Sequence, residues 1–327
     1  MDSPSASQPP KPSVQHLRYL ATGGALFLLG LKHAVLTVIT FGIYGFWAKN
    51  ATRVFHYSHT ELGGEPFAYH GTGGELLRGT IRASAIIFAI SFLVVLVPGL
   101  LLDGSDPTYG GLIALAVYPI FGLFALFAIN SARRYRFSRS SWRGIRFSYH
   151  GQTGPFMGMM LKGLLLTIVT LGFYGPVFAT QRRAYLVNNV RYGSEPFVYE
   201  GEARPLYGEF IKAWLLTIPT LGLIWIWYGA FVQRYMWSHT RVAGARFIST
   251  VTGGGLLSLA FTNMLLVAFT LGIGTPWAMV RVHEYAAANL VLRGAPDWAT
   301  IQQRAQEAGA TGEGMAEGLD VDVGLGI

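Results

Sequence analysis

Three lysines are the leading candidates for chemistry in this sequence, because each interrupts an apolar run. Lys32, Lys162 and Lys212 lie eight residues before a threonine in three related segments. An ionisable residue at membrane depth is a candidate functional group. The competing interpretation, which we favour, is a lysine near a helix end that extends its ammonium group to lipid headgroups. Glu209 lies three residues before Lys212 and predicts an i,i+3 ion pair in that copy.

Arginine and tyrosine residues recur together where the apolar runs end. Such pairs anchor helices at a membrane interface, and they could also clamp an anionic headgroup or solute. We favour anchoring, because several copies of one contact indicate an architectural role. The candidate headgroup or anion contacts are Arg53, Arg133, Arg134, Arg182, Arg183, Arg234, Tyr135, Tyr185 and Tyr235.

Two histidines, His56 and His59, are three residues apart and could bind a metal from one helix face. In the other copies of the segment, the position of His59 is occupied by Arg139, Asn189, His239 and Asn289. An exchange of His, Arg and Asn is typical of a recurring polar contact, such as a helix C-terminal cap or a headgroup contact. We therefore expect no metal site.

The elements that must position these residues form a repeat. Five units have equivalent positions offset by 80, 130, 180 and 230 residues from the first. Each unit reads as an apolar helix with a Thr-Leu/Phe-Gly break, a basic amphipathic continuation and a short alternating hairpin such as "GGEPFAYHG" at 63–71. We expect these strands to pair with one another. The fourth hairpin decays and the fifth stops at "RGAP", so a perfectly regular array is not expected.

The composition predicts a membrane protein. Hydrophobic residues make up 51% of the 327 residues and charged residues 13%, against about 25% charged residues in soluble domains. Two uncharged runs, 83–102 and 107–132, are long enough to span a bilayer. With the repeated apolar stretches, the expected fold is mainly α: a polytopic helical membrane protein of tandem helix-plus-short-β-hairpin repeats with about six apolar helices.

Two topologies fit the repeated apolar runs. Six full spans would put the basic segment 181–205 outside, against the positive-inside rule. In the second topology the helix bends at Thr-Leu-Gly and returns, so that some helices are re-entrant with both ends inside. We favour six spans.

The ends of the chain differ from the repeats. Residues 1–22 are polar and Pro/Ser-rich and are expected to be a disordered tail, 23–293 the repeat-built membrane domain, and 294–327 an acidic C-terminal tail. The acidic tail is either solvated, which we favour, or docked on the basic hairpins, with a short ordered stretch expected near Trp298 to Ala305. No cysteine is present, which excludes disulfides and thiolate metal sites.

Three longer stretches carry a family resemblance. "TLGFYGPVFATQRRAYLVNN", "GGEPFAYHGTGGELLRG" and "TGEGMAEGLDVDVGLGI" resemble the YjgN family of bacterial inner-membrane proteins, catalogued as a domain of unknown function. The resemblance covers nearly all of residues 25–327. It implies a multi-pass protein of the bacterial inner (cytoplasmic) membrane with no assigned reaction, and it brings no catalytic or ligand residues.

The leading functional hypothesis is a transporter or channel-like protein for a small solute, because internal repeats and broken helices recur in transporters. The alternative is a non-transporting scaffold that binds anionic lipid or a partner protein through Arg/Tyr-rich cytoplasmic segments. No hydrolase, zinc-protease or kinase motif occurs, so we expect no enzyme activity and no cofactor. Membrane lipid is the expected partner. Nucleic acid is not, because the arginines flank apolar segments. The substrate and the oligomeric state stay open.

Overall fold

The computed structural model describes residues 13–96, 107–294, 296, 298 and 301. In this part of the chain, ten short antiparallel strands form a closed barrel in the order β1-β10-β9-β8-β7-β6-β5-β4-β3-β2. The strands are β1 (Ser13–Tyr19), β2 (Thr60–Leu62), β3 (Glu65–Tyr69), β4 (Ser140–Trp142), β5 (Ile145–Tyr149), β6 (Val190–Tyr192), β7 (Glu195–Tyr199), β8 (Thr240–Val242), β9 (Ala245–Ser249) and β10 (Leu290–Gly294).

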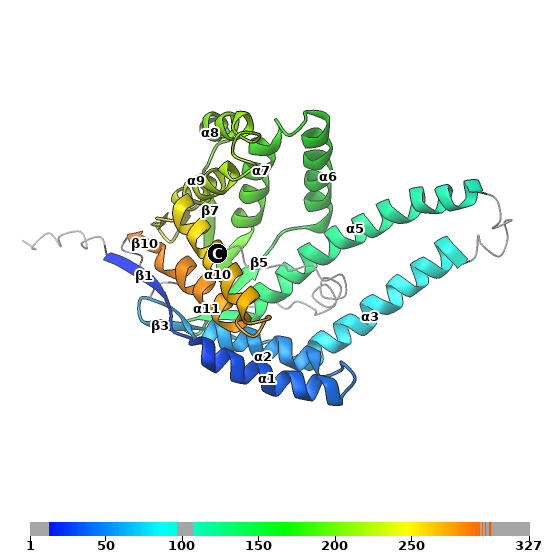
Figure 1. Cartoon of the computed structure of the whole chain (residues 1–327), viewed down its shortest axis with the longest axis horizontal. Helices are drawn as coiled ribbons and strands as arrows, with labels where there is room; N and C mark the ends of the chain where they lie inside the picture. Colours follow the sequence, from blue (N-terminus) through cyan, green and yellow to red (C-terminus); the bar gives the residue numbers. More distant parts are fainter. Residues whose placement is uncertain (1–12, 97–106, 295, 297, 299–300, 302–327) are drawn as a thin grey trace, which may run out of the picture.

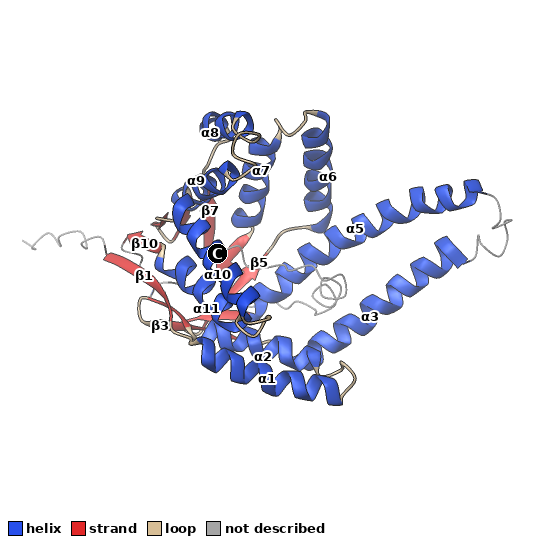
Figure 2. Cartoon of the chain, viewed as in Figure 1, coloured by secondary structure: helices blue, strands red, loops and turns tan. Residues whose placement is uncertain are grey.

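Five helix pairs extend from the barrel within the described residues (Figures 1 and 2). A π-helical turn, η1 (Phe92–Leu96), continues α3, and the pair α3/α5 extends farthest from the barrel (Figure 1). The pairs are α1 (Gly23–Ile39) with α2 (Gly45–Ser58), α3 (Gly73–Ser91) with α5 (Pro107–Arg139), α6 (Thr153–Val169) with α7 (Gly175–Asn188), α8 (Arg204–Leu215) with α9 (Ile224–Ser238), and α10 (Gly253–Phe269) with α11 (Thr275–Ala288).

All these helices join the barrel at the same end. In the first β-hairpin the chain turns at Gly63 and Gly64, and the opposite ends of the two strands, Thr60 and Tyr69, lead directly to α2 and α3. The next three hairpins repeat this arrangement. Because paired antiparallel strands have their turns at one end and their connections at the other, the helices lie on one side of the barrel and the hairpin turns on the opposite side.

Each short helix pair reverses at the repeated Thr-Leu/Phe-Gly sequence. In the first pair, Phe41 and Gly42 have positive φ angles of 50° and 92°. The Gly42 amide donates to the Thr37 carbonyl at 2.8 Å, as in a Schellman motif. Glycine adopts this conformation freely, whereas Phe41 bears the cost of the left-handed region. The repeated sequence is therefore a helix C-terminal turn, which agrees with the bend at Thr-Leu-Gly in our second topology.

Strand β1 completes the fifth β-hairpin. Gln15 lies opposite Leu292 in the β1/β10 pair, as Glu65 lies opposite Leu62 in the first hairpin. β1 also pairs with β2, and this closes the ring. The N-terminal strand β1 therefore takes the place that the second strand of a hairpin has in the other units, and pairs with β10. The fifth hairpin that we expected to be missing is completed, because a closed ring lets a strand from the other end of the chain fill the last position. The array is nevertheless not perfectly regular, since the second helix pair is longer than the others.

One backbone hydrogen bond recurs at every junction between neighbouring units. The amide that follows the second strand of one hairpin donates to the carbonyl that precedes the first strand of the next. The pairs are Leu20–His59 (2.8 Å), His70–Arg139 (2.7 Å), His150–Asn189 (2.8 Å), Glu200–His239 (3.1 Å) and Thr250–Asn289 (3.0 Å). The first of these lies where β1 joins the ring, so the closing junction has the same geometry as the others.

A glycine packed against a tryptophan joins neighbouring helix pairs at three junctions. A Cβ atom on Gly73 would lie 2.7 Å from the Trp47 ring, and one on Gly253 would lie 2.5 Å from the Trp227 ring. Gly23 of α1 packs in the same way against Trp277 of α11. Because only glycine permits this approach, the sequence specifies the closing contact between the first and last helices.

The expected polytopic helical fold with about six apolar helices is wrong. The strands form a closed barrel, which confirms that they pair with one another. Among the described residues, one helix, Gly73–Val94, is long and apolar enough to cross a membrane. The second unit contains a lengthened helix pair where we expected an additional span, because equivalent positions are offset by 50 at α3 and by 80 at α5. Part of the expected span 83–102 lies outside the described residues.

The N-terminal segment differs from expectation, whereas Trp298 and Ile301 agree with the short ordered stretch expected near Trp298 to Ala305. Residues 13–19 of the expected disordered tail form β1, because the open ring offers this segment two strand partners. Trp298 and Ile301 of the C-terminal segment pack in the hydrophobic core of the barrel. Residues 1–12 and 302–327 lie outside the described residues, so the choice between a solvated and a docked acidic tail stays a prediction.

Candidate functional site

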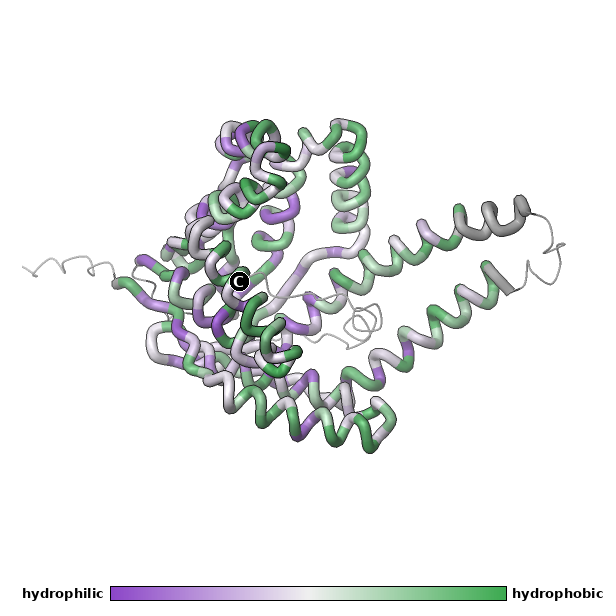
Figure 3. The backbone as a smooth tube through the Cα atoms, viewed as in Figure 1, coloured by the Kyte–Doolittle hydropathy of each residue, from purple (hydrophilic) through white to green (hydrophobic). Residues whose placement is uncertain are grey.

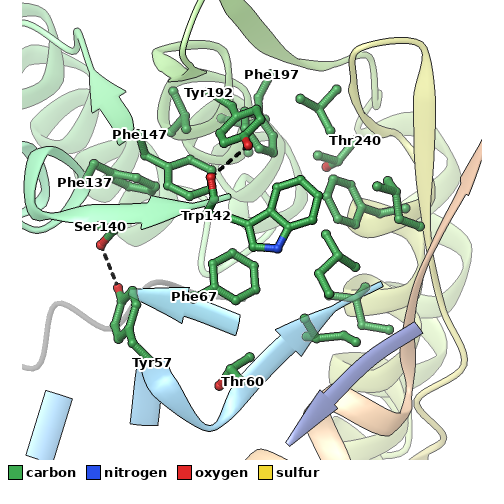
Figure 4. Close-up of a pocket in the computed structure, with 18 of the residues that line it drawn as sticks. Tyr57, Thr60, Phe67, Phe137, Ser140, Trp142, Phe147, Tyr192, Phe197 and Thr240 are labelled. Atoms are coloured by element: carbon green, nitrogen blue, oxygen red, sulfur yellow. Dashed lines mark hydrogen bonds between the residues drawn. The ribbon is translucent and has the colours of Figure 1, made fainter. Parts of the chain in front are cut away.

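A cavity of about 570 Å³ lies inside the barrel and reaches the bases of the helices. Side chains alternate along a strand, so every second residue of each strand faces inward. One inward layer consists of equivalent residues from all five units: Leu17, Phe67, Phe147, Phe197 and Phe247. A second consists of Leu62, Trp142, Tyr192, Val242 and Leu292. The wall of the barrel is therefore apolar and largely aromatic (Figure 4).

Hydroxyl groups of the cavity lining form hydrogen bonds within the protein. Ser140 donates a hydrogen bond to the Tyr57 hydroxyl at 3.1 Å, and the Tyr192 hydroxyl donates to the Trp142 carbonyl at 2.9 Å (Figure 4). Burial raises the pKa of Tyr57 to about 12. Because these hydroxyls stay protonated and bonded inside the protein, the barrel wall offers mainly apolar contact to a ligand.

A tryptophan from the C-terminal segment packs into the barrel beside its aromatic layer. The Trp298 ring lies edge-on to Trp142, with 4.8 Å between the ring centroids, and 5.9 Å from Tyr192. Trp298 and Ile301 belong to the cluster that includes Leu62 and Leu292, on the side of the hairpin turns. The cavity is therefore apolar at this end.

Cationic groups gather at the opposite end, where the helix pairs join the barrel. Arg53, Arg133, Arg183 and His283 occupy the same position in four of the five units, and all four line the cavity. Arg136 joins them one turn farther along α5. Of the described residues that line the cavity, none is Asp or Glu. We call Arg53, Arg133, Arg136 and Arg183 the arginine layer.

Burial makes this positive charge costly. The Arg183 guanidinium lies 4.4 Å from the centre of the Trp237 ring. Desolvation and, to a smaller extent, the charge of Arg133 together lower the pKa of Arg183 to about 10. The Nε atom of Arg133 is buried without a hydrogen-bond partner in the described structure. A cation in a partly apolar environment is stabilised by a nearby anion. The half-buried arginine layer is therefore suited to an anion.

The three lysines lie away from this cavity. Lys32, Lys162 and Lys212 are exposed on the first helix of their pairs, and none of them lines the cavity. Lys212 forms the ion pair with Glu209 that the sequence predicted, with 2.7 Å between Nζ and Oε1. At an exposed site such a pair contributes little stability.

The recurring tyrosines join the two helices of a pair at their base. Tyr185 of α7 donates to the carbonyl of Gln152, the N-cap residue of α6. Tyr235 accepts from the amide of Glu202 at 2.9 Å, before α8. Tyr135 donates to Glu75 of α3 at 2.7 Å. Their hydroxyls therefore make contacts within the protein.

The other predicted arginines divide between protein contacts and solvent. Arg134 donates to the Gly151 carbonyl at 2.7 Å, and Arg234 donates to the Val251 carbonyl at 2.5 Å. Arg182 is exposed and lies over the Phe178 ring at 5.9 Å. Of the candidate anion contacts, the structure brings together Arg53, Arg133 and Arg183.

The position of His59 is a helix C-terminal cap, the first of the two polar contacts that its substitution pattern suggested. His59, Asn189, His239 and Asn289 are the C-cap residues of four helices. Each side chain donates to the carbonyl four residues earlier, at 2.7 to 2.9 Å. No group of three or more potential ligands that could hold a metal occurs among the described residues.

His56 has a different place from its neighbour. It lines the cavity, stacks on His283 with 4.3 Å between ring centroids, and hydrogen-bonds the Tyr19 hydroxyl at 2.6 Å. Desolvation, with smaller contributions from the nearby His283 and His59, lowers its pKa to about 4. A neutral His56 therefore sits where α11, β1 and α2 meet at the closing junction.

The sequence analysis missed the apolar half of the site. Leu17 lies in a segment expected to be disordered, and Trp298 lies in the expected tail. The sequence did contain a sign of the phenylalanine layer, because the phenylalanines at 67, 147, 197 and 247 occupy equivalent positions. Equivalent positions in a closed ring have the same orientation relative to its axis, so these phenylalanines had to face inward together or outward together. Closure itself was not visible in the sequence.

Comparisons with known proteins identify relatives in the bacterial inner membrane. The chain is 29% identical over 136 residues to "Inner membrane protein YjgN" of Salmonella typhimurium strain LT2, which covers 41% of this chain and 31% of the relative. It is 27% identical over 129 residues to the protein of that name from Escherichia coli O157:H7, covering 39% of this chain and 29% of the relative. The match thus spans about a third of these relatives' length.

No solved structure matches the chain. A family model described as "Bacterial protein of unknown function (DUF898)" matches residues 14–224 and 215–318. These two matches include the whole barrel from β1 to β10 and every helix pair. The chain therefore belongs to the DUF898 family of bacterial proteins of unknown function, whose curated relatives here carry the name YjgN.

Proposed function

We propose that this protein is an inner-membrane protein that binds an acidic amphiphile in the barrel cavity. The acid group contacts the arginine layer, and the apolar chain fills the aromatic interior. The relatives' names support the membrane location. The proposal refines the lipid-binding alternative from the sequence and assigns binding, without catalysis or a cofactor.

One observation carries this proposal: cations and an apolar wall share one cavity, and its described lining has no carboxylate. Arg53, Arg133 and Arg183 come from three different units and converge at its helix end. The guanidinium group matches carboxylate and phosphate oxygens in a bidentate geometry. An anion at this point would place an opposite charge beside these half-buried cations, while its chain would contact Phe67 and Phe147.

The size of the cavity agrees with a ligand of moderate size. Small-molecule sites occupy roughly 300–1,000 Å³ and combine an apolar lining with a few polar groups. The volume of about 570 Å³ lies within that range. A single-chain acid of this size suits the barrel better than a complete diacyl phospholipid.

The transporter hypothesis has less support from the geometry. It depended on a path that reaches Lys32, Lys162 and Lys212, and these lysines are exposed outside the described lining of the cavity. The same observation favours the lipid-binding alternative, because the arginines are the cations that share a cavity with apolar side chains.

A fluorescent fatty acid tests the proposal directly. The purified protein in detergent is titrated with cis-parinaric acid and with its methyl ester. We expect the acid to bind and the ester to bind at least tenfold more weakly, since a charged hydrogen bond contributes about 1.5–3 kcal/mol and about 1.4 kcal/mol is tenfold in affinity. Arg183→Gln should weaken the acid at least tenfold.

Arg182→Gln is the matched control, because Arg182 is adjacent on the same helix and exposed. It should leave acid binding unchanged. Competition with palmitate and with lysophosphatidic acid then shows whether the acid group is a carboxylate or a phosphate. If the acid and the ester bind equally, or if both Gln variants behave alike while keeping the wild-type melting temperature, the arginine layer does not select an acid and the proposal fails.

A further inference from the structure

The four shorter helix pairs end in exposed apolar turns. The residue at the apex of each turn is a large apolar side chain: Phe41 is 98% exposed, Leu171 82%, Leu221 92% and Leu271 93%. Neighbouring residues extend these surfaces, including Ile218 at 85% and Phe269 at 84%. Apolar residues predominate toward the ends of the pairs (Figure 3). Four equivalent apolar surfaces of this kind mark a contact with an apolar partner.

The backbone polar groups at these turns form hydrogen bonds within the protein. Each turn threonine donates its hydroxyl hydrogen to a carbonyl one turn earlier, for example Thr170 to Leu166 at 2.6 Å. The glycine amides donate to helix carbonyls, as Gly172 does to Thr167 and Gly222 does to Thr217, both at 2.7 Å. A polypeptide in lipid must satisfy its backbone polar groups with hydrogen bonds inside the protein, whereas a loop in water can form these hydrogen bonds with the solvent.

A belt of cations surrounds the helix pairs at one level. Lys32, Arg82, Lys162 and Lys212 occupy equivalent positions on the first helix of four pairs, and all are exposed. Thr262 has this position in the last pair, and there Arg281 of α11 donates to its hydroxyl at 2.9 Å. Each of the five helix pairs in the described residues therefore presents a cation at this level, which we call the cationic belt.

The distance from the belt to the turns matches one leaflet. Eight residues separate Lys162 from Thr170, or about 12 Å at 1.5 Å per residue. Half of the hydrocarbon thickness is about 15 Å. A pair that crossed both leaflets would place Leu171 in water on the far side. Lys49 lies nearer the turn of the first pair, and its long side chain can extend toward the headgroups.

We propose that the pairs α1/α2, α6/α7, α8/α9 and α10/α11 insert into a single leaflet, with their turns in the hydrocarbon and the cationic belt at anionic headgroups. The occupant of the apolar surface is lipid. Because all helices join one end of the barrel, the barrel lies on the side of that same leaflet, and the helix end of its cavity faces the membrane. The pair α3/α5 continues deeper than its belt residue, Arg82.

The sequence permits a clean test, because it contains no cysteine. Single cysteines replace Leu171 and Leu221 at the turns and Lys162 and Lys212 in the belt. Each variant is labelled with bimane and reconstituted into phosphatidylglycerol/phosphatidylethanolamine vesicles. Lipids with a nitroxide at the headgroup or near the end of the acyl chain quench the label according to its depth. The turn residues are so exposed that labels there should not disturb folding.

We expect the acyl-chain nitroxide to quench both turn labels several-fold more strongly than the headgroup nitroxide, with the reverse order for both belt labels. Two outcomes overturn the proposal. Access of an impermeant thiol reagent to the turn cysteines of the unlabelled variants from the side opposite the barrel would show that these pairs cross the bilayer. Equal quenching by aqueous iodide with and without vesicles would show that the turns do not enter lipid. Neither outcome depends on ligand binding in the barrel.

Discussion

The barrel and the ends of the helix pairs come from the same repeat, but apolar residues are buried in the barrel and exposed at the ends of the helix pairs. In the barrel, Leu292 is 1% exposed and Trp142 is 3% exposed. At the turns of the helix pairs, Leu221 and Leu271 are more than nine-tenths exposed. The high hydrophobic content of the chain therefore has two origins, a protein interior and an outward surface, and only the outward surface requires lipid.

The two regions also differ in how strictly the repeat is kept. The turns retain Thr-Leu/Phe-Gly in four units. The cavity position of Arg53, Arg133 and Arg183 becomes Gln233 and then His283 in the last two units. A surface that meets a uniform bilayer suits identical elements, whereas a cavity that distinguishes one ligand needs different side chains around it.

The largest expected difference between the two regions is the cost of removing a leucine side chain. Leu292→Ala leaves a space in the packed barrel and should lower the free energy of unfolding by about 2–5 kcal/mol. Leu221→Ala removes a similar side chain at an exposed turn and should change it by less than about 0.5 kcal/mol. Thermal unfolding in detergent, followed by tryptophan fluorescence, measures both. Equal shifts would contradict the assignment of one leucine to the core and the other to the surface.

A smaller effect is expected where the first and last helix pairs meet. Gly23→Ala forces a methyl group into the Trp277 ring and should cost about 1–3 kcal/mol of stability through overpacking. Gly24→Ala is the control, because nothing lies within 4 Å of the added atom. Gly73→Ala should cost as much as Gly23→Ala if the closing junction is equivalent to an internal one. A closing variant as stable as its control would show that the ring is not closed by α1 and α11.

The smallest effect concerns pH at the closing junction. The pKa of His56 is lowered from 6.5 to about 4, so as pH falls the unfolded chain binds this proton before the folded chain does. The stabilising contribution is therefore complete above pH 6.5 and is lost as pH falls toward 4. His56→Gln should make the melting temperature fall less between these values.

The control for this pH effect is His16→Gln, because the His16 side chain of β1 is exposed, and this variant should keep the wild-type profile. The pKa values of His70 and His150 are also lowered, mainly by desolvation, so the slope should be reduced in His56→Gln and not abolished. A wild-type profile in His56→Gln would show that His56 stays accessible to protons in the folded protein.

Local chemistry could be predicted from single segments. The alternation in "GGEPFAYHG" predicts a strand, and the spacing of Glu209 and Lys212 predicts their ion pair. The exchange of His, Arg and Asn at position 59 predicts a recurring polar contact, either a helix cap or a headgroup contact. These features depend on contacts within a few residues. The arginines could be named as anion contacts, but Arg182 and Arg183 could not be distinguished, because the side of α7 that faces the cavity depends on how the helix is oriented in the ring.

The sequence by itself determined the repeat, the short strands that pair with one another and the family, and it offered the turns at Thr-Leu/Phe-Gly as the less favoured of two topologies. Only the tertiary structure decided that the ring closes through β1, that Leu17 and Trp298 join the barrel interior, and that Arg53, Arg133 and Arg183 share one cavity. The physical reason is that closure depends on the summed twist and packing of all the units. A single unit has the same sequence pattern whether its neighbours form an open array or a ring, so no local pattern records which residues face the common axis.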